Sequence, residues 1–358
     1  MIRLIGFEFG KIFKRRIVFA ALGMLVVFGI MLYMGNGPQE VISRLPDGTY
    51  IGGAEAIAYD KKVAAEYEGV LTEEKVRSIL EQYAPEAPDG GLWTINSTYN
   101  TVQHFFGNLD GSWNGLTVEE ALPDYQGEEP LLLGYTDGYT GFIMMGMYLM
   151  VTLGFVLIIA LSPVFSEEYS RGTDALILTS RYGKTRCGLA KIFAAYLFTL
   201  LITGIFLLVT ILLFLTGFGL TGGDSSIQLN SRDLLYALPY FMTCLEAAGS
   251  SLLLWLAGAL ILTALVLILS ALCRTSFLAL LMALTLYLLP MLGPSLHISR
   301  KLLSLAPFWC FLSEWTLTFP KFLGGQLSWS WIPALMSVVL IPVALCFGRR
   351  IFARHQAG

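Results

Sequence analysis

Long uncharged apolar runs recur along the chain, and its charged residues are concentrated in the segments between and before them. A helix needs roughly 20 apolar residues to cross about 30 Å of hydrocarbon. We therefore predict an all-α polytopic membrane protein with six transmembrane helices. These are placed at residues 17–34, 139–165, 188–218, 243–272, 275–295 and 326–348.

Residues 1–16 have the pattern of an amphipathic helix. Their apolar side chains recur at helical spacing, at Ile2, Ile5, Phe9, Ile12 and Phe13. Such a helix can lie in the plane of the membrane interface, with its basic side toward lipid phosphates. We predict that Lys11, Lys14 and Arg15 anchor it there. The alternative is a simple lead-in to the first span.

Charge is distributed unevenly. Only 14% of the residues are charged, against about 25% in a soluble domain. Residues 35–138, between the first two spans, hold eighteen acidic and five basic side chains, a net charge of −13. We interpret this segment as a large acidic extracytoplasmic insertion.

The positive residues of the shorter segments predict the orientation. Long loops cross the membrane largely regardless of charge, so residues 35–138 are left out of the count. With the N-terminus inside, fourteen Lys and Arg residues are cytosolic and four lie in the outer segments. We expect both termini in the cytosol, including the tail at 349–358, and a bacterial cytoplasmic membrane as the location.

Two outer segments follow from this layout. Residues 219–240 form the outer loop before the fourth span. Residues 296–324 combine aromatic side chains with a few charges. That composition suits an outer interfacial segment, or one that dips into the membrane and returns.

The chain holds no motif for chemistry of its own. Its five cysteines and three histidines are scattered, so we predict neither a metal site nor catalytic residues. Gly183-Lys184-Thr185 lacks the earlier glycine of a phosphate-binding loop, because position 178 is leucine. The basic residues lie at the ends of spans instead of forming one patch, which argues against a nucleic-acid partner.

One acidic residue, Glu246, stands at the outer edge of the fourth span. An ionisable residue near a membrane is a candidate for function. It can also simply reach the headgroup region by extending its side chain. Both interpretations remain open from the sequence.

Residues 166–187, after the second span, mix both charge signs densely and then become apolar. This pattern suits a cytosolic helix that docks a soluble partner, and it also suits an ordinary solvated turn. The N-terminal basic helix, Phe165 with Glu168, the triplet Arg171-Gly172-Thr173 and Lys191 together resemble the permease subunits of ABC-2 type transporters.

The resemblance implies that 166–187 is the coupling helix, which enters a cleft of a separate ABC ATPase subunit. The contact residues that it implies are Glu167, Glu168, Arg171, Gly172 and Thr173. It further implies an ATP-driven exporter with a second permease copy or homologue. This chain then carries no cofactor, and ATP and Mg are bound by the partner.

The apolar spans suit a hydrophobic, peptide or drug-like substrate. The alternative function is a non-transporting membrane sensor or anchor, whose extracytoplasmic domain binds a ligand or a partner.

Overall fold

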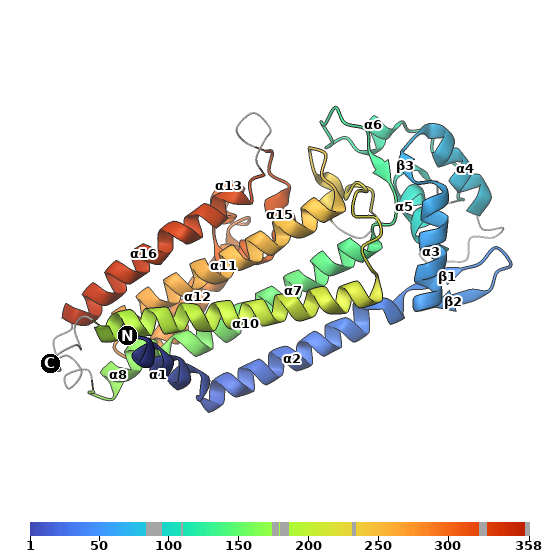
Figure 1. Cartoon of the computed structure of the whole chain (residues 1–358). Coiled ribbons are helices and arrows are strands. Elements are labelled where there is room, and N and C mark those ends of the chain that lie inside the picture. Colours follow the sequence, from blue (N-terminus) through green and yellow to red (C-terminus); the bar gives the residue numbers. More distant parts are fainter. Residues whose placement is uncertain are drawn as a thin grey trace.

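The computed structural model describes residues 1–83, 95–108, 110–173, 179, 186–230, 234–321 and 328–354. A bundle of long helices occupies one part of the molecule, and a smaller domain made of short helices and strands lies at its far end (Figure 1). The N-terminus and the end of α16 (Trp331–Arg354) lie at the opposite end of the bundle (Figure 1).

Five helical segments of the described chain are long and apolar enough to cross a membrane. The bundle contains α2 (Arg16–Asn36), α7 (Asp137–Leu161), α8 (Pro163–Ser170), α10 (Gly188–Gly217), α11 (Cys244–Leu272) and α16 (Trp331–Arg354). The helices α7 and α8 follow each other directly and count as one such segment, Asp137–Ser170. Helical segments of this kind make the chain a multi-pass α-helical membrane protein.

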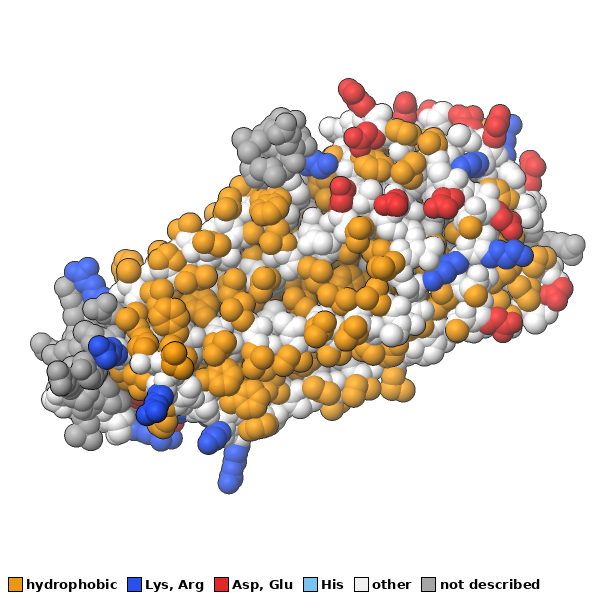
Figure 2. Space-filling model, viewed as in Figure 1, with side chains coloured by type: hydrophobic (Ala, Val, Ile, Leu, Met, Phe, Trp, Pro, Cys, Tyr) orange, Lys and Arg blue, Asp and Glu red, His pale blue; other side chains and the backbone are white. Residues whose placement is uncertain are grey.

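The surface agrees with this architecture. Figure 2 shows apolar side chains over the sides of the bundle, acidic side chains over the small domain, and Lys and Arg at the other end. Helix α2 is largely exposed, with Met24, Met31 and Met34 all more than 60% accessible. A surface of this kind requires an apolar surrounding.

The fifth predicted span, 275–295, is shorter than expected. Helix α12 (Ser276–Leu288) ends after 13 residues, and the tighter 3₁₀ turn η5 (Leu289–Leu292) follows with Pro290 near its start. Proline has no backbone N–H and a fixed φ, so the regular helix stops there. The apolar pattern alone does not reveal this break, because the residues on both sides of it are apolar, and Pro290 is the signal for it in this stretch of the sequence.

The chain then turns back toward the bundle. Three short helices follow: α13 (Arg300–Leu303), α14 (Pro307–Phe311) and α15 (Ser313–Leu317). Both α14 and α15 pack against α11, and Cys310 and Phe311 are fully buried. The described part of segment 296–324 is therefore folded onto the helices. That it enters the membrane stays a prediction.

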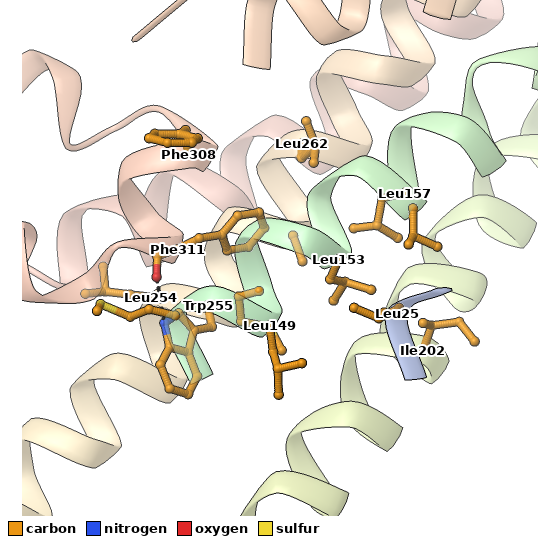
Figure 3. Packing of buried hydrophobic residues seen from close by; sticks show 14 of the residues in the cluster. Leu25, Leu149, Leu153, Leu157, Ile202, Leu254, Trp255, Leu262, Phe308 and Phe311 are labelled. Carbon is orange, nitrogen blue, oxygen red and sulfur yellow. Dashed lines mark hydrogen bonds between the residues drawn. The ribbon is translucent and has the colours of Figure 1, made fainter. Parts of the chain in front are cut away.

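The centre of the bundle is a tightly packed apolar core, seen in Figure 3, where α7 meets α11 and α14. The indole Nε1 of Trp255 donates a hydrogen bond of 3.0 Å to the carbonyl oxygen of Phe311. This bond ties α11 to α14 and satisfies the only polar atom of the tryptophan side chain. Gly146 of α7 lies directly against the same ring.

The small domain is formed by the part of the chain between α2 and α7. Its helices are α3 (Ala54–Glu66), α4 (Glu73–Tyr83), α5 (Ser97–Phe106) and α6 (Val118–Ala121). Two antiparallel pairs complete it: β1 (Ile42–Arg44) with β2 (Tyr50–Gly52), and β3 (Gly69–Val70) with β4 (Leu132–Leu133). It has its own apolar core, and Leu229, from the segment between α10 and α11, is buried in it. The domain is thus joined to the bundle by packing as well as by the chain.

The contact between Gly146 and Trp255 generates a prediction about stability. A Cβ at position 146 would lie 2.0 Å from the ring atom Cη2 of Trp255. We expect Gly146→Ala to lower the free energy of unfolding by roughly 1–3 kcal/mol, because the core cannot take the extra methyl group. Thermal unfolding in detergent measures the effect.

Gly204 supplies the matched control, because nothing lies within 4 Å of a Cβ placed there on α10. Gly204→Ala should be neutral or stabilising by up to about 1 kcal/mol. Equal unfolding temperatures for the two variants would contradict the packing described here.

Candidate functional site

The predicted coupling residues lie at the end of the bundle formed by α1 (Ile2–Phe13), α8 and the first turn of α10. We call this the basal end. The helix predicted to finish at residue 165 continues as α8 to Ser170. Glu167 and Glu168 are therefore helical residues, and α8 contacts α10, α11 and α12. Helix α1 packs along α10 (Figure 1).

The central group of the basal end is the ammonium of Lys191. Its side chain is 1% exposed, although it lies in the first turn of a long apolar helix. The Nζ atom lies 2.6 Å from Glu168 Oε1 and 3.0 Å from Glu8 Oε2. It also donates to the carbonyl oxygen of Val164 at 3.3 Å. All three donors of the ammonium are thus used.

Lys11 completes this group of charges. Its Nζ lies 3.2 Å from the same Oε1 of Glu168, and its side chain is 32% exposed. Two carboxylates and two ammonium groups therefore sum to zero. A buried charge is tolerated only when it is paired and hydrogen-bonded, and this arrangement meets that condition for Lys191 and Glu8.

A second set of charges adjoins the first. The guanidinium of Arg15 pairs with Glu167, and its Nη1 also donates to the carbonyl oxygen of Ala160 at 3.1 Å. Arg171 pairs with the other oxygen of Glu167 at 2.6 Å and remains 68% exposed. We call the two sets together the ion-pair cluster: Glu8, Lys11, Arg15, Glu167, Glu168, Arg171 and Lys191.

The triplet Arg171-Gly172-Thr173 forms the end of α8. Gly172 has a φ of +65°, which glycine adopts without strain. Its N–H donates to Tyr169, and the N–H of Thr173 donates to Glu168, both at main-chain oxygens. This pair of bonds is the Schellman motif, which satisfies the last carbonyls of a helix. Helix termination alone accounts for this glycine.

The predicted contact residues are thus not equivalent. Glu167 and Glu168 point into the ion-pair cluster, Gly172 and Thr173 close the helix, and Arg171 presents most of its side chain outward. Residues 174–178 and 180–185 of the predicted coupling segment lie outside the described residues. Direct contact with an ATPase stays a prediction.

The three predicted lipid anchors also differ in their surroundings. Lys11 and Arg15 are bound by carboxylates of α8, whereas Lys14 is exposed. Glu246 is exposed as well, and its Oε2 accepts from the N–H of Thr243 in a capping box that begins α11. A structural role thus accounts for Glu246, and a functional one stays a prediction.

The sequence analysis did not single out Glu8 and Lys191 as a pair. They are 183 positions apart, and only the fold brings them together. A signal was present in each case. Glu8 is the only acidic residue before Glu40, and Lys191 is followed by an uncharged run that extends beyond residue 220.

A separate buried carboxyl group lies in α15. Glu314 is 7% exposed, and burial raises the pKa of its carboxyl to about 7. Phe311, Thr316 and Leu317, which are close to it in the sequence, are buried as well. Near neutral pH this carboxyl is therefore neutral in a substantial fraction of the molecules.

These observations define a multi-pass membrane protein with a charged basal end. A sequence model described as ABC-2 family transporter protein matches residues 64–348, which is more than half of the chain. The chain therefore belongs to the ABC-2 transporter family and has the permease role of its membrane components, which lack a nucleotide-binding domain of their own. No curated protein and no solved structure matches the chain.

The matched region includes Glu167, Glu168 and Lys191, whereas Glu8, Lys11 and Arg15 lie before it. The membership confirms the resemblance on which the sequence analysis relied.

The burial of Lys191 generates a second prediction. Lys191→Met leaves two buried carboxylates without their shared cation, so we expect a loss of roughly 3–5 kcal/mol in the free energy of unfolding. Replacing Glu8 and Glu168 by Gln in the same chain should restore most of it. Thermal unfolding in detergent is the measurement.

Lys14→Met serves as the matched control, since Lys14 is an exposed cation at the same end of the chain. We expect it to have little effect. If Lys191→Met unfolds at the same temperature as Lys14→Met, the buried pairing does not stabilise the basal end.

Glu314 generates a third prediction. The pKa of the Glu314 carboxyl in the folded protein is about 7, above the usual value of a glutamate. The stability that its protonated form contributes to the fold is therefore complete below about pH 4.3, and it is lost as the pH rises through about 7. Glu314→Gln should therefore raise the unfolding temperature at pH 8 relative to the parent chain, and less so at pH 5. Glu119→Gln, at an exposed position, should show no such difference.

Proposed function

We propose that the chain is the permease subunit of an ATP-driven ABC-2 type exporter with six spans and both termini in the cytosol. In this proposal α12 together with η5 completes the six spans, as the fifth in chain order, and the basal end is cytosolic. The concentration of Lys and Arg at that end supports the orientation, because cytosolic segments of membrane proteins are enriched in both (Figure 2). The domain between α2 and α7 is then outside.

The ion-pair cluster is the observation that carries the proposal. The carboxylates of Glu167 and Glu168 begin the coupling segment, and they are held by Arg15, Lys11 and Lys191 from the N-terminal region and α10. A force applied to this segment is therefore transmitted to both of these elements. Packed and ion-paired elements move as discrete bodies and not as continuously deformable material.

The proposed cycle follows from this connection. A separate ABC ATPase subunit binds the coupling segment 166–187, and ATP and Mg are bound by that subunit. Closure of the ATPase pair moves α8 together with α1 and the base of α10. A second permease copy or a homologue completes the pathway between the two chains. The apolar faces of the bundle favour a hydrophobic, peptide or drug-like substrate.

Co-purification tests the proposal. The chain is extracted in mild detergent from its native membrane, and the proteins that accompany it are identified by mass spectrometry. We expect a soluble ABC ATPase in near-stoichiometric amount. If gentle crosslinking recovers the chain alone or with a signalling protein, the transporter proposal fails and the sensor or anchor function takes its place.

The exposed side chain of Arg171 generates a fourth prediction. Arg171→Glu reverses the charge of the most exposed of the three charged contact residues, and we expect it to reduce the amount of co-purified ATPase at least severalfold. Arg274→Glu is the matched control, because Arg274 is an exposed cation in the turn before α12, which packs against α8. Equal recovery of ATPase with both variants would place the contact elsewhere.

A further inference from the structure

The junction between α7 and α8 is a break in an otherwise continuous helical segment. Helix α7 ends at Leu161, Ser162 lies between the two helices, and Pro163 begins α8. Proline has no N–H to donate to the preceding turn, and its ring displaces the carbonyl four residues earlier. The polar backbone groups around residues 160–166 therefore need other partners.

Ser270 of α11 supplies several of them. Its hydroxyl oxygen accepts from the N–H of Phe165 at 3.0 Å and from the N–H of Ser166 at 3.3 Å. The same hydroxyl donates to the carbonyl oxygen of Ser162 at 2.6 Å. One donor and two acceptor positions are all that a serine hydroxyl has, so its hydrogen-bonding capacity is fully used.

Two cations of the ion-pair cluster bind further carbonyl groups of the junction. Arg15 donates to the carbonyl oxygens of Ala160 and Pro163, at 3.1 and 3.5 Å. Lys191 donates to the carbonyl oxygen of Val164 at 3.3 Å. The groups that hold the carboxylates of α8 are therefore also the groups that satisfy the backbone of the junction.

The junction is closed to water, because Ser162, Ser166 and Ser270 are each at most 1% exposed. A polar group that loses its partner here cannot be solvated, which makes each of these bonds more important than at a surface. At the same time, the partners are side chains from other elements. They can be exchanged without breaking the regular hydrogen bonds inside α7 or α8.

We propose that the Ser162–Pro163 junction is a hinge about which α8 turns relative to α7, and that Ser270 is the positioning residue that holds it in the present orientation. The proposal rests on the proposed function, in which α8 begins the coupling segment. Helix α8 has eight residues and is about 12 Å long. A turn of about 20° at its start would thus move its far end by about 4 Å.

The distance between α7 and α8 tests the hinge in the chain alone. Spin labels are placed at Tyr148→Cys on α7 and Ser170→Cys on α8, both exposed positions. The two cysteines that are not buried, Cys187 and Cys346, are replaced by serine. Pulsed electron–electron double resonance then gives the distribution of distances across the junction in detergent.

We expect Ser270→Ala to enlarge a second population in the distance distribution about 3- to 10-fold, because the variant removes three of the hydrogen bonds at the junction. The change in distance is smaller than the roughly 4 Å that the tip of α8 moves, because that movement is largely perpendicular to the line between the labels. Ser251→Ala is the matched control. Ser251 is equally buried on the same helix, and its hydroxyl has no hydrogen-bond partner among the described residues. It should leave the distribution unchanged.

Pro163→Ala provides a readout that loss of packing alone would not give. Alanine restores the N–H at position 163, so α7 and α8 can join in one regular helix. In that background Ser270→Ala should no longer shift the distance. Identical distributions for Ser270→Ala and Ser251→Ala would overturn the hinge, and so would a shift that persists after Pro163→Ala.

This measurement is independent of the proposed function, since it needs no ATPase. If the distances change as expected but no ATPase co-purifies with the chain, the hinge stands and the coupling function fails. If the ATPase is bound and Ser270→Ala leaves the distances unchanged, the function stands and the hinge is overturned.

Discussion

A lysine ammonium placed in apolar surroundings is stable only if the fold supplies negative charge to it. Lys191 is such a group, at the start of a long apolar helix, and Glu8 and Glu168 both reach it. Lys191 is paired only if α1 lies against α10 and if α8 turns the face that carries Glu168 toward both helices. The positions of α1 and α8 relative to α10 are thus tied to one buried charge.

The same requirement links the cluster to the break in the helix above it. Arg15 and Lys191 each bind one carboxylate of α8 and also bind carbonyl oxygens around Pro163. Ser270 of α11 binds three more backbone groups of the junction, those of Ser162, Phe165 and Ser166. A change at the coupling segment therefore alters the charges and the backbone of the junction together. In this account α8, α1 and the base of α10 move together relative to α7.

The apolar runs alone predicted much of this architecture, because membrane crossing demands length and hydrophobicity that a sequence displays directly. They did not predict the end of α12 at Leu288, because a 3₁₀ turn with Pro290 is as apolar as a helix. The charge pattern drew attention to Glu167 and Glu168, but their partners depend on contacts between distant segments. The burial of Leu229 in the small domain was unpredictable for the same reason.

The central claim is that α1, α8 and the base of α10 move as one body. Cryo-electron microscopy of the permease with its co-purified ATPase, without nucleotide and with a non-hydrolysable ATP analogue, tests it most directly. The account predicts that Lys191 keeps both Glu8 and Glu168 as partners in the two states, while the angle between α7 and α8 changes at Ser162. A structure in which α8 stays in line with α7 and separates from α1 would contradict it.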